Sequence, residues 1–203
     1  MAVVLATRNP RKVEEIRRIL EGCGITIRTL EDFPNCPGVA EDGQTFAENA
    51  VKKAVAVARY TGQTALADDS GLEVDALGGA PGVASARYAG DRADDRMNLA
   101  KLLEELQPVG EAEWRARYVC CVALASPGGS VQTFLGYAEG TVGREPRGCH
   151  GFGYDPIFYP TGQGRTFAEM DAHEKDAISH RGRALRAVKA HLKGEPGQPP
   201  GQG

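Results

Sequence analysis

The sequence lacks the motifs that define several well-known classes of protein. Its five cysteines are an odd number without C-x-x-C spacing, so we expect neither a disulfide framework nor a zinc site. His173 and His180 do not have the H-E-x-x-H spacing of a zinc protease, and no G-x-x-x-x-G-K-[ST] phosphate-binding loop occurs. These absences argue against a secreted disulfide scaffold, a zinc protease and a P-loop nucleotide-binding protein.

The chain also lacks a strong net charge and long hydrophobic runs. Its formal net charge of −3 gives no overall basic field, so a nucleic-acid polymer is not an expected partner. No apolar run approaches the length of a membrane span and no signal-peptide pattern opens the chain, so we expect a cytoplasmic protein without a membrane partner. Residues 194–203 are rich in glycine, proline and glutamine, and we expect this tail to be disordered.

The pattern of hydrophobic residues predicts alternating strands and helices within a single domain over residues 1–193. Strands are expected at residues 3–5, 25–30, 64–67, 115–125 and 131–138. Helices are expected from Pro10 to before Gly22, from Thr45 to about Tyr60, at 94–106 and at 171–192, with a break near Ser179. Because βα units occur together with a hairpin about residues 126–130, we expect an α/β fold with a mixed sheet.

The most informative segment is Asp68-Asp69-Ser70-Gly71, which follows a short apolar run. We interpret it as the end of a buried strand that delivers two carboxylates to a turn. Adjacent like charges repel, and their burial requires a neutralising group, for which a divalent cation is the usual choice. Oxygen ligands without a nearby histidine favour Mg²⁺ or Mn²⁺ over zinc. The alternative is a polar turn without a metal.

Two further segments are suited to binding phosphate. Residues 7–12 join a strand to the helix that begins at Pro10, and a helix N-terminus attracts anions, here with help from Lys12. The helix that begins at Thr45, where Glu48 completes a capping box, places Asn49 and Lys53 on its apolar face. An ordinary capped helix and a lysine that reaches out to solvent are the alternatives.

Two other segments are suited to binding a planar base. Glycines flank Phe152 in the segment 151–156, which allows its ring to stack on a flat ligand. Lys175 and Ser179 are one helical turn apart, and His180 and Arg181 add donors at the break that follows. The alternatives are a simple turn with Tyr154 in the core, and a solvated charged helix.

Together these segments resemble the inosine triphosphate pyrophosphatase family, the Ham1/RdgB-like pyrophosphatases of non-standard purine nucleotides. The matching segments are T-x-N-x-x-K at 7–12, T-F-x-E-N-A at 45–50 with Lys53, A-D-D-S-G-L-x-V-D-A-L-G-G-A-P-G-V at 67–83, S-A-R-Y-A-G at 85–90, G-F-G-Y-D-P-I-F at 151–158 and E-K-x-x-I-S-H-R at 174–181. They cover residues 2–192 in order. Arg8 stands where members of the family often have glycine, and Ala84 stands where they often have an aromatic residue. Neither change removes a group that the chemistry needs.

The resemblance implies Mg²⁺-dependent hydrolysis of ITP, dITP and XTP to the monophosphate and pyrophosphate by a homodimer. It also implies an elongated mixed sheet with flanking helices, in two lobes with the active-site cleft between them. Asp69 would accept the proton of the attacking water and bind the metal, with Glu41 as second ligand and Asp42 as an open alternative. The implied substrate-binding residues are Thr7, Arg8, Asn9, Pro10, Arg11, Lys12, Lys53 and Ser70 at the triphosphate, Phe152, Gly153, Tyr154 and Asp155 flanking the base, and Lys175, His180 and Arg181 at its edge.

Two other functions stay open at this point. A non-catalytic nucleotide-binding module would keep the helix N-terminus and the aromatic platform, but it would not need Asp69 with an acidic partner. The second possible function is that of a Maf-like pyrophosphatase, which acts on modified pyrimidine or 7-methylguanine nucleotides. The complete S-H-R motif at 179–181 argues against it. The sequence does not rank ITP, dITP and XTP as substrates.

Overall fold

The computed structural model describes residues 1–110 and 114–195, which form two compact units. Unit 1 comprises residues 1–69, 120–136 and the chain from 181 onward, and unit 2 comprises residues 70–119 and 137–180. The prediction of a single domain with a cleft between two lobes stays a prediction. Of the tail expected to be disordered, Gly194 and Glu195 follow the last helix, and residues 196–203 lie outside the described part of the chain.

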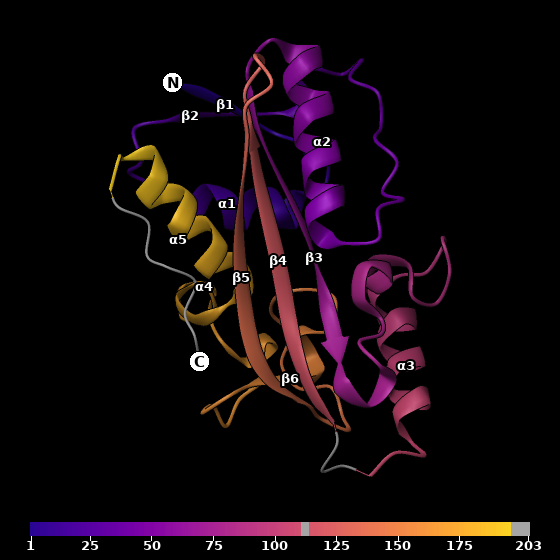
Figure 1. The fold of residues 1–203 in the computed structure, drawn as a ribbon. Helices are drawn as coiled ribbons and strands as arrows, with labels where there is room; N and C mark the ends of the chain where they lie inside the picture. The colour runs from indigo at the N-terminus through magenta and orange to yellow at the C-terminus, as the bar shows by residue number, and fades with distance from the viewer. Residues whose placement is uncertain (111–113, 196–203) are drawn as a thin grey trace. The chain divides into compact units, whose positions relative to one another are not determined.

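The predicted mixed α/β fold is confirmed (Figure 1). The strands are β1 (Ala2–Leu5), β2 (Thr26–Thr29), β3 (Thr64–Val74), β4 (Arg115–Ala125), β5 (Val131–Val142) and β6 (Phe158–Pro160). The helices are α1 (Pro10–Ile19), α2 (Phe46–Thr61), α3 (Asp95–Leu106), α4 (Ala172–Ile178) and α5 (His180–Leu192). One six-stranded sheet has the order β2-β1-β3-β4-β5-β6. β1 pairs in parallel with β2 and β3, whereas β5 and β6 are antiparallel.

The structure corrects the prediction that a strand ends at Ala67 and passes two aspartates to a turn. β3 continues to Val74, so Asp68 and Asp69 lie inside the strand, and both are buried. Aspartate and glycine are rare in strands, which is why their appearance indicated a turn. Here cationic side chains compensate the carboxylates, and the strand continues through them.

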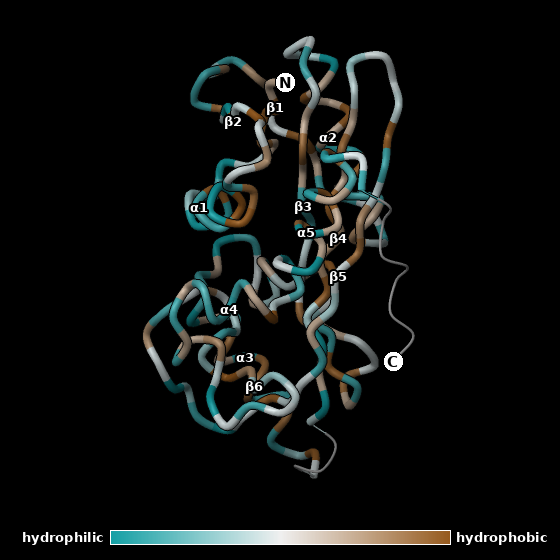
Figure 2. Tube along the Cα trace, turned by 90° about the vertical axis from the view of Figure 1, so that its left-hand side faces the viewer, coloured by the Kyte–Doolittle hydropathy of each residue, from teal (hydrophilic) through white to brown (hydrophobic). Residues whose placement is uncertain are grey.

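In unit 1, helices cover both faces of the strands (Figure 1). Val3 and Leu5 of β1 face a cluster that includes Ile16 of α1 and Leu185 of α5. Val4 lies between them in the strand and is also buried, and it therefore points to the opposite face of the sheet. Figure 2 shows α1 as hydrophobic on one side and hydrophilic on the other, as expected for a helix packed on a sheet.

The start of α2 follows the sequence prediction only in part. The Thr45 hydroxyl accepts a hydrogen bond from the Glu48 N–H at 3.1 Å, as the predicted capping box requires. The Glu48 carboxylate accepts from the Gln44 N–H instead of the Thr45 N–H. Half of the predicted capping box is therefore present, and the second half is shifted by one residue.

Unit 2 has its own hydrophobic core, which is rich in aromatic residues. Leu102 of α3 and Trp114 pack there with Phe158 and Phe167, and all four are buried. The predicted break at Ser179 is confirmed, because Ser179 ends α4 and α5 begins at His180. No helix in the described part of the chain is long and apolar enough to cross a bilayer.

Candidate active site

The two adjacent carboxylates of β3 lie in different surroundings within unit 1. Successive side chains of a strand point to opposite faces of the sheet, so Asp68 and Asp69 separate although they are neighbours in sequence. Asp68 contacts Lys12 of α1 and Arg181 of α5. Asp69 contacts Asn49 and Lys53 of α2. The strand therefore resolves the repulsion between adjacent acids by giving each its own cations.

Asp68 is the centre of a buried ion-pair network. Its Oδ2 lies 2.9 Å from Lys12 Nζ and accepts hydrogen bonds from Nη2 and Nε of Arg181 at 3.0 and 3.2 Å. The third donor group of Arg181, Nη1, pairs with Glu15, a buried residue of α1. Burial alone would raise the pKa of Asp68, but Lys12 and Arg181 outweigh it and hold that pKa well below the ordinary value. Asp68 is therefore a permanent anion that holds Lys12 in place.

Asp69 is the carboxylate whose surroundings suit it to accept a proton. Its Oδ2 accepts a hydrogen bond from the Asn49 amide at 3.0 Å, and its Oδ1 lies 3.3 Å from Lys53 Nζ. Burial raises the pKa of Asp69 in spite of the nearby ammonium groups of Lys53 and Lys12. A raised pKa makes a carboxylate a better proton acceptor, so Asp69 has the properties of a general base.

Lys53 links the two predicted metal ligands. Its ammonium lies 3.3 Å from Asp69 Oδ1 and 3.2 Å from Glu41 Oε1. Burial would lower the pKa of Lys53, but the charges of Asp69, Asp68 and Glu41 together raise it, so the side chain stays protonated. Lys53 therefore does not reach out to solvent, which was the alternative interpretation from sequence.

The arrangement of Glu41 and Asp69 fits a magnesium site. One oxygen of each carboxylate lies beside the Lys53 ammonium, whose positive charge offsets their negative charge here. Mg²⁺ is commonly held by one or two carboxylates together with substrate phosphates, and it needs no larger protein cluster. The described residues contain no group of three or more acidic, cysteine or histidine side chains that could hold a metal ion, and the magnesium site stays a prediction. Asp42 instead pairs with Lys52 at 2.7 Å, so the geometry supports Glu41 as the second ligand.

The segment 7–12 has the predicted form of a capped helix start. Pro10 is the first residue of α1, and the Asn9 side chain accepts from the N–H groups of Arg11 and Lys12 at 3.0 and 3.4 Å. Thr7 accepts from the Asn9 N–H, which fixes the turn. The Arg8 guanidinium donates to the Cys36 carbonyl. Asn9 and Arg11 are exposed, and Lys12 is partly buried, so this segment offers polar groups to a ligand.

Arg181, which the resemblance places at the edge of a base, lies in the buried ion-pair network of unit 1. Its side chain is 2% exposed and is held in unit 1 by Asp68 and Glu15. Burial would lower the pKa of Arg181, and these two carboxylates instead raise it. In this structure Arg181 is thus a structural cation of the Asp68 network, and its contact with a base stays a prediction.

The turn at residues 151–156 of unit 2 holds Phe152, the residue predicted to be a stacking platform, and its contact with a base stays a prediction. Phe152 is partly exposed, and its N–H donates to the Asp155 carboxylate at 2.9 Å. Gly151 has a positive φ of 70°, and a Cβ there would lie 2.1 Å from the same carboxylate, so the turn requires glycine. Lys175 Nζ lies 2.7 Å from Asp155 and 5.0 Å from the centre of the Phe152 ring. This turn holds an aromatic face beside a buried ion pair.

The remaining predicted residues of unit 2 support this platform. The Gly153 N–H donates to Asp95, the first residue of α3, at 2.9 Å. Tyr154 is a core residue whose hydroxyl donates to the Ser85 carbonyl, which matches the alternative from sequence, and its contact with a base stays a prediction. His180 is buried and stacks on Tyr118. Ser70 follows Asp69 in β3 and is partly exposed.

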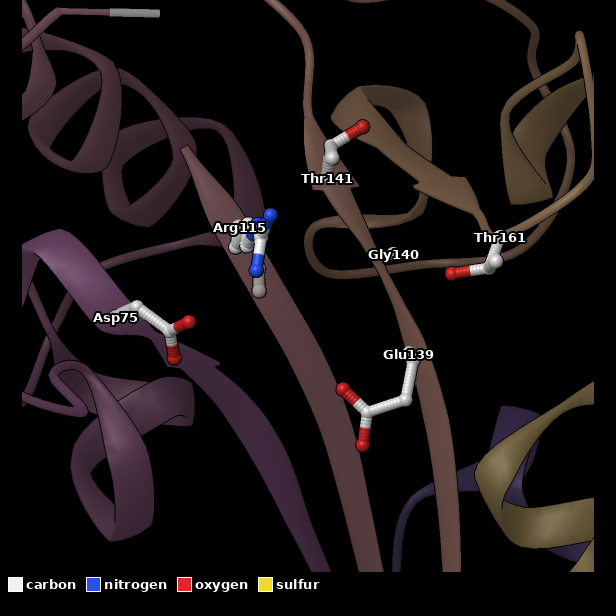
Figure 3. Close-up of a pocket in the computed structure, with 7 residues that line it drawn as sticks. Asp75, Arg115, Glu139, Gly140, Thr141 and Thr161 are labelled. Carbon is white, nitrogen blue, oxygen red and sulfur yellow. The ribbon is translucent and has the colours of Figure 1, made fainter. Parts of the chain in front are cut away.

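A separate pocket of about 340 Å³ lies in unit 2 (Figure 3). It is lined by Asp75, Arg115, Ala116, Glu139, Gly140, Thr141 and Thr161, none of which belongs to the predicted site. Figure 3 shows the Asp75 and Glu139 carboxylates on either side of the Arg115 guanidinium. The charged groups are exposed and of mixed sign, and no aromatic ring lines the pocket, so it suits neither phosphate nor base binding.

Three residues of these clusters were missed by the sequence-based site prediction. Asn49 connects the Gly43 N–H to Asp69, and its place on the apolar stripe of α2 was a usable signal. Glu15 and Tyr118 carry no signal in the sequence. Glu15 resembles any solvated helix residue, and Tyr118 resembles any core aromatic of a strand.

Comparisons with known proteins identify the family of this chain. A family model described as the Ham1 family matches residues 3–191. A protein of Geobacter sulfurreducens named dITP/XTP pyrophosphatase is 54% identical over 190 residues, which are 94% of this chain and 96% of that protein. A protein of Desulforamulus reducens with the same name is 52% identical over 92% of each chain. The solved structure of a HAM1 protein from Coxiella burnetii superposes with a TM-score of 0.88 at 43% identity, covering 96% of this chain and 99% of that one. The chain belongs to the Ham1 family.

Proposed function

We propose that this chain is a pyrophosphohydrolase of dITP, XTP and ITP that releases the monophosphate and pyrophosphate. The observation that carries the chemistry is the opposed surroundings of Asp68 and Asp69, one a fixed anion and the other a proton acceptor. The substrate class rests on relatives named dITP/XTP pyrophosphatase, which are about half identical over nearly their full length. A Maf-like enzyme is not supported, since the family model that matches is that of Ham1.

The triphosphate binds through the cations and polar groups of unit 1. Lys12, held by Asp68, and Lys53, held by Asp69 and Glu41, supply positive charge. The Thr7 hydroxyl and the Asn9 side-chain amide add hydrogen-bond donors, and the start of α1, whose first N–H groups already donate to Asn9, adds a favourable helix dipole. Arg8 and Arg11 are exposed at the same segment, and Ser70 follows the general base.

Asp69 orients the attacking water and takes its proton. Its Oδ2 is fixed by Asn49, whose own carbonyl is held by the Gly43 N–H at 2.8 Å. A Cβ on Gly43 would lie 2.6 Å from Asn49 Oδ1, so this close approach needs glycine. The base is therefore held by a rigid chain of contacts while burial keeps its pKa raised.

Glu41 and Asp69 would hold Mg²⁺, with Asp42 engaged by Lys52. Such an ion lowers the pKa of bound water and offsets negative charge on a phosphoryl group. Pyrophosphate is the expected leaving group because cleavage at the α-phosphorus keeps it intact. The homodimer and the cytoplasmic location remain predictions.

The base binds in unit 2, where Phe152 supplies a stacking face. Lys175 and His180 supply donors, and the 6-oxo group of hypoxanthine or xanthine is an acceptor. Adenine has a 6-amino donor at that place, so donors on the protein would face a donor on the base. Leaving such buried groups unpaired costs about 1–3 kcal/mol each, which favours 6-oxopurines.

A product assay tests this proposal. The purified protein is incubated with dITP, XTP, ITP, GTP and ATP, with Mg²⁺ or with EDTA, and the products are identified. We expect equal amounts of monophosphate and pyrophosphate from dITP, XTP and ITP, and loss of activity in EDTA. Orthophosphate as first product would refute attack at the α-phosphate, and undiminished activity in EDTA would refute the metal.

A further inference from the structure

The segment that carries Glu41 has few internal supports. Residues 37–42 form neither helix nor strand, and between Glu31 and Asp42, all of which the structure describes, Cys36 is the only buried residue. A segment with little buried surface opens at a low cost in free energy, so a single contact can decide how firmly it is held. The position of Glu41 therefore depends on what holds the two ends of this segment.

The end next to α2 is held by side chains of that helix. The Gly43 N–H donates to the Asn49 side-chain carbonyl at 2.8 Å, and the Gln44 N–H donates to the Glu48 carboxylate at 2.8 Å. Both acceptors belong to the first turn of α2, so they fix the backbone of this end relative to the helix.

The other end is held by Arg8, from the segment that precedes α1. Nη2 of Arg8 donates to the Cys36 carbonyl at 2.8 Å, although the two residues are 28 positions apart in sequence. The Cys36 N–H donates to the Phe33 carbonyl at 2.9 Å, so this peptide is fixed on both sides. A hydrogen bond from a charged donor is stronger than one between neutral groups. Arg8 thus ties the start of the segment that carries Glu41 to the predicted phosphate-binding residues 7–12.

We propose that Arg8 is a positioning residue, which holds the segment 37–42 beside residues 7–12 so that Glu41 is in place to act as a magnesium ligand. The inference rests on the proposed function and goes beyond it, because Arg8 was predicted only as a contact of the triphosphate. A direct contact with phosphate is the competing interpretation. That contact would need the charge of Arg8 but not its hydrogen bond to Cys36.

Limited digestion with a protease that cleaves after glutamate tests the hold on this segment in the absence of nucleotide and metal. Arg8→Met removes the donors and keeps an unbranched side chain, and Arg8 is exposed, so the melting temperature should change little. Cleavage after Glu41 follows the population of the opened segment. It should be about 5-fold faster in Arg8→Met than in the wild type, the scale of one net hydrogen bond.

Arg11→Met is the matched control for the digestion. It removes the charge of another exposed arginine of residues 7–12, and cleavage after Glu41 should keep the wild-type rate. The second measurement is the Mg²⁺ concentration needed for half-maximal activity at saturating ITP. Arg8→Met should raise this concentration about 5-fold, because a less firmly held segment presents Glu41 for a smaller fraction of the time.

Three results would overturn the inference. Cleavage of Arg8→Met at the wild-type rate would do so, even with a raised KM for ITP, since Arg8 would then serve only the phosphates. Faster cleavage with an unchanged Mg²⁺ requirement would show that the hold on the segment does not serve Glu41. Cleavage at glutamates throughout the chain would assign Arg8 to the stability of the whole fold. If the wild type hydrolyses no nucleotide, the proposed function fails, while the digestion still shows whether Arg8 holds the segment.

Discussion

Asp68 and Asp69 are consecutive residues of β3, yet their surroundings shift the pKa values of the two carboxyls in opposite directions. Asp68 faces Lys12 and Arg181, which stabilise its charge. Asp69 is buried beside Lys53 and Asn49, and the loss of solvation outweighs these two contacts and raises its pKa. Paired carboxyls with separated pKa values are a recurring arrangement in acid–base catalysis, because each can then take a different role.

The first prediction compares the two carboxylates by the same substitution. Asp69→Asn should lower kcat at least ~100-fold, the scale of a lost general base. Its melting temperature should stay level or rise, since burial disfavours the charge that is removed. Asp68→Asn should instead destabilise the protein by about 3–5 kcal/mol, because Lys12 and Arg181 lose their buried counter-charge. Near-normal turnover of Asp69→Asn would assign the base elsewhere.

The second prediction concerns acid unfolding of the metal-free protein. The pKa of Asp68 is lowered in the folded state, so its ion pairs stabilise the fold at pH values above its ordinary pKa of 3.8. Below pH 3.8 the unfolded chain takes up a proton at this carboxyl while Asp68 of the folded protein stays ionised, so this stabilisation should decline progressively as the pH falls toward the lower pKa of the folded state. Urea unfolding in EDTA at pH 7 and pH 3 measures it. Because Asp68→Asn lacks the titrating group, its free energy of unfolding should fall less between these two pH values than that of the wild type.

Much of the fold was predictable because its signals are local. Pro10 with Asn9 before it, and Thr45 before an apolar stripe, mark helix starts in the sequence and do so in the structure. The break at Ser179 and the hairpin about 126–130 were found in the same way. Each of these features depends on residues a few positions apart.

The features that were not predictable depend on distant residues. β3 continues through Asp68 and Asp69 only because Lys12, Lys53 and Arg181 approach from other elements. Arg181 follows Ser179 and His180 in a motif that was predicted to bind a base. Its side chain instead donates to Asp68, which is 113 residues away in sequence. Local patterns identify reactive residue types, whereas the partner of each charge is decided by tertiary structure.

The third prediction separates Glu41 from Asp42 as the magnesium ligand. Glu41 shares Lys53 with Asp69, whereas Asp42 pairs with Lys52 on an exposed part of the chain. Glu41→Gln should raise the Mg²⁺ concentration needed for half-maximal activity by about 10-fold or more, because a charged ligand is lost. Asp42→Asn is the matched control and should leave that concentration unchanged. The reverse result would make Asp42 the ligand.

The last prediction concerns Arg181, whose guanidinium joins Asp68 to Glu15 within unit 1. Arg181→Ala leaves two buried carboxylates without their shared cation, so it should destabilise the protein by about 3–5 kcal/mol. Glu15→Gln keeps an acceptor for Arg181 but removes one charge, and it should destabilise less while raising KM through a less firmly held Lys12. Urea unfolding and kcat/KM for ITP and ATP measure both effects. If Arg181 supports the phosphate cluster, both nucleotides should lose activity to a similar degree. Unchanged stability with a smaller ratio of ITP to ATP would instead show that Arg181 leaves the ion pair to read the base.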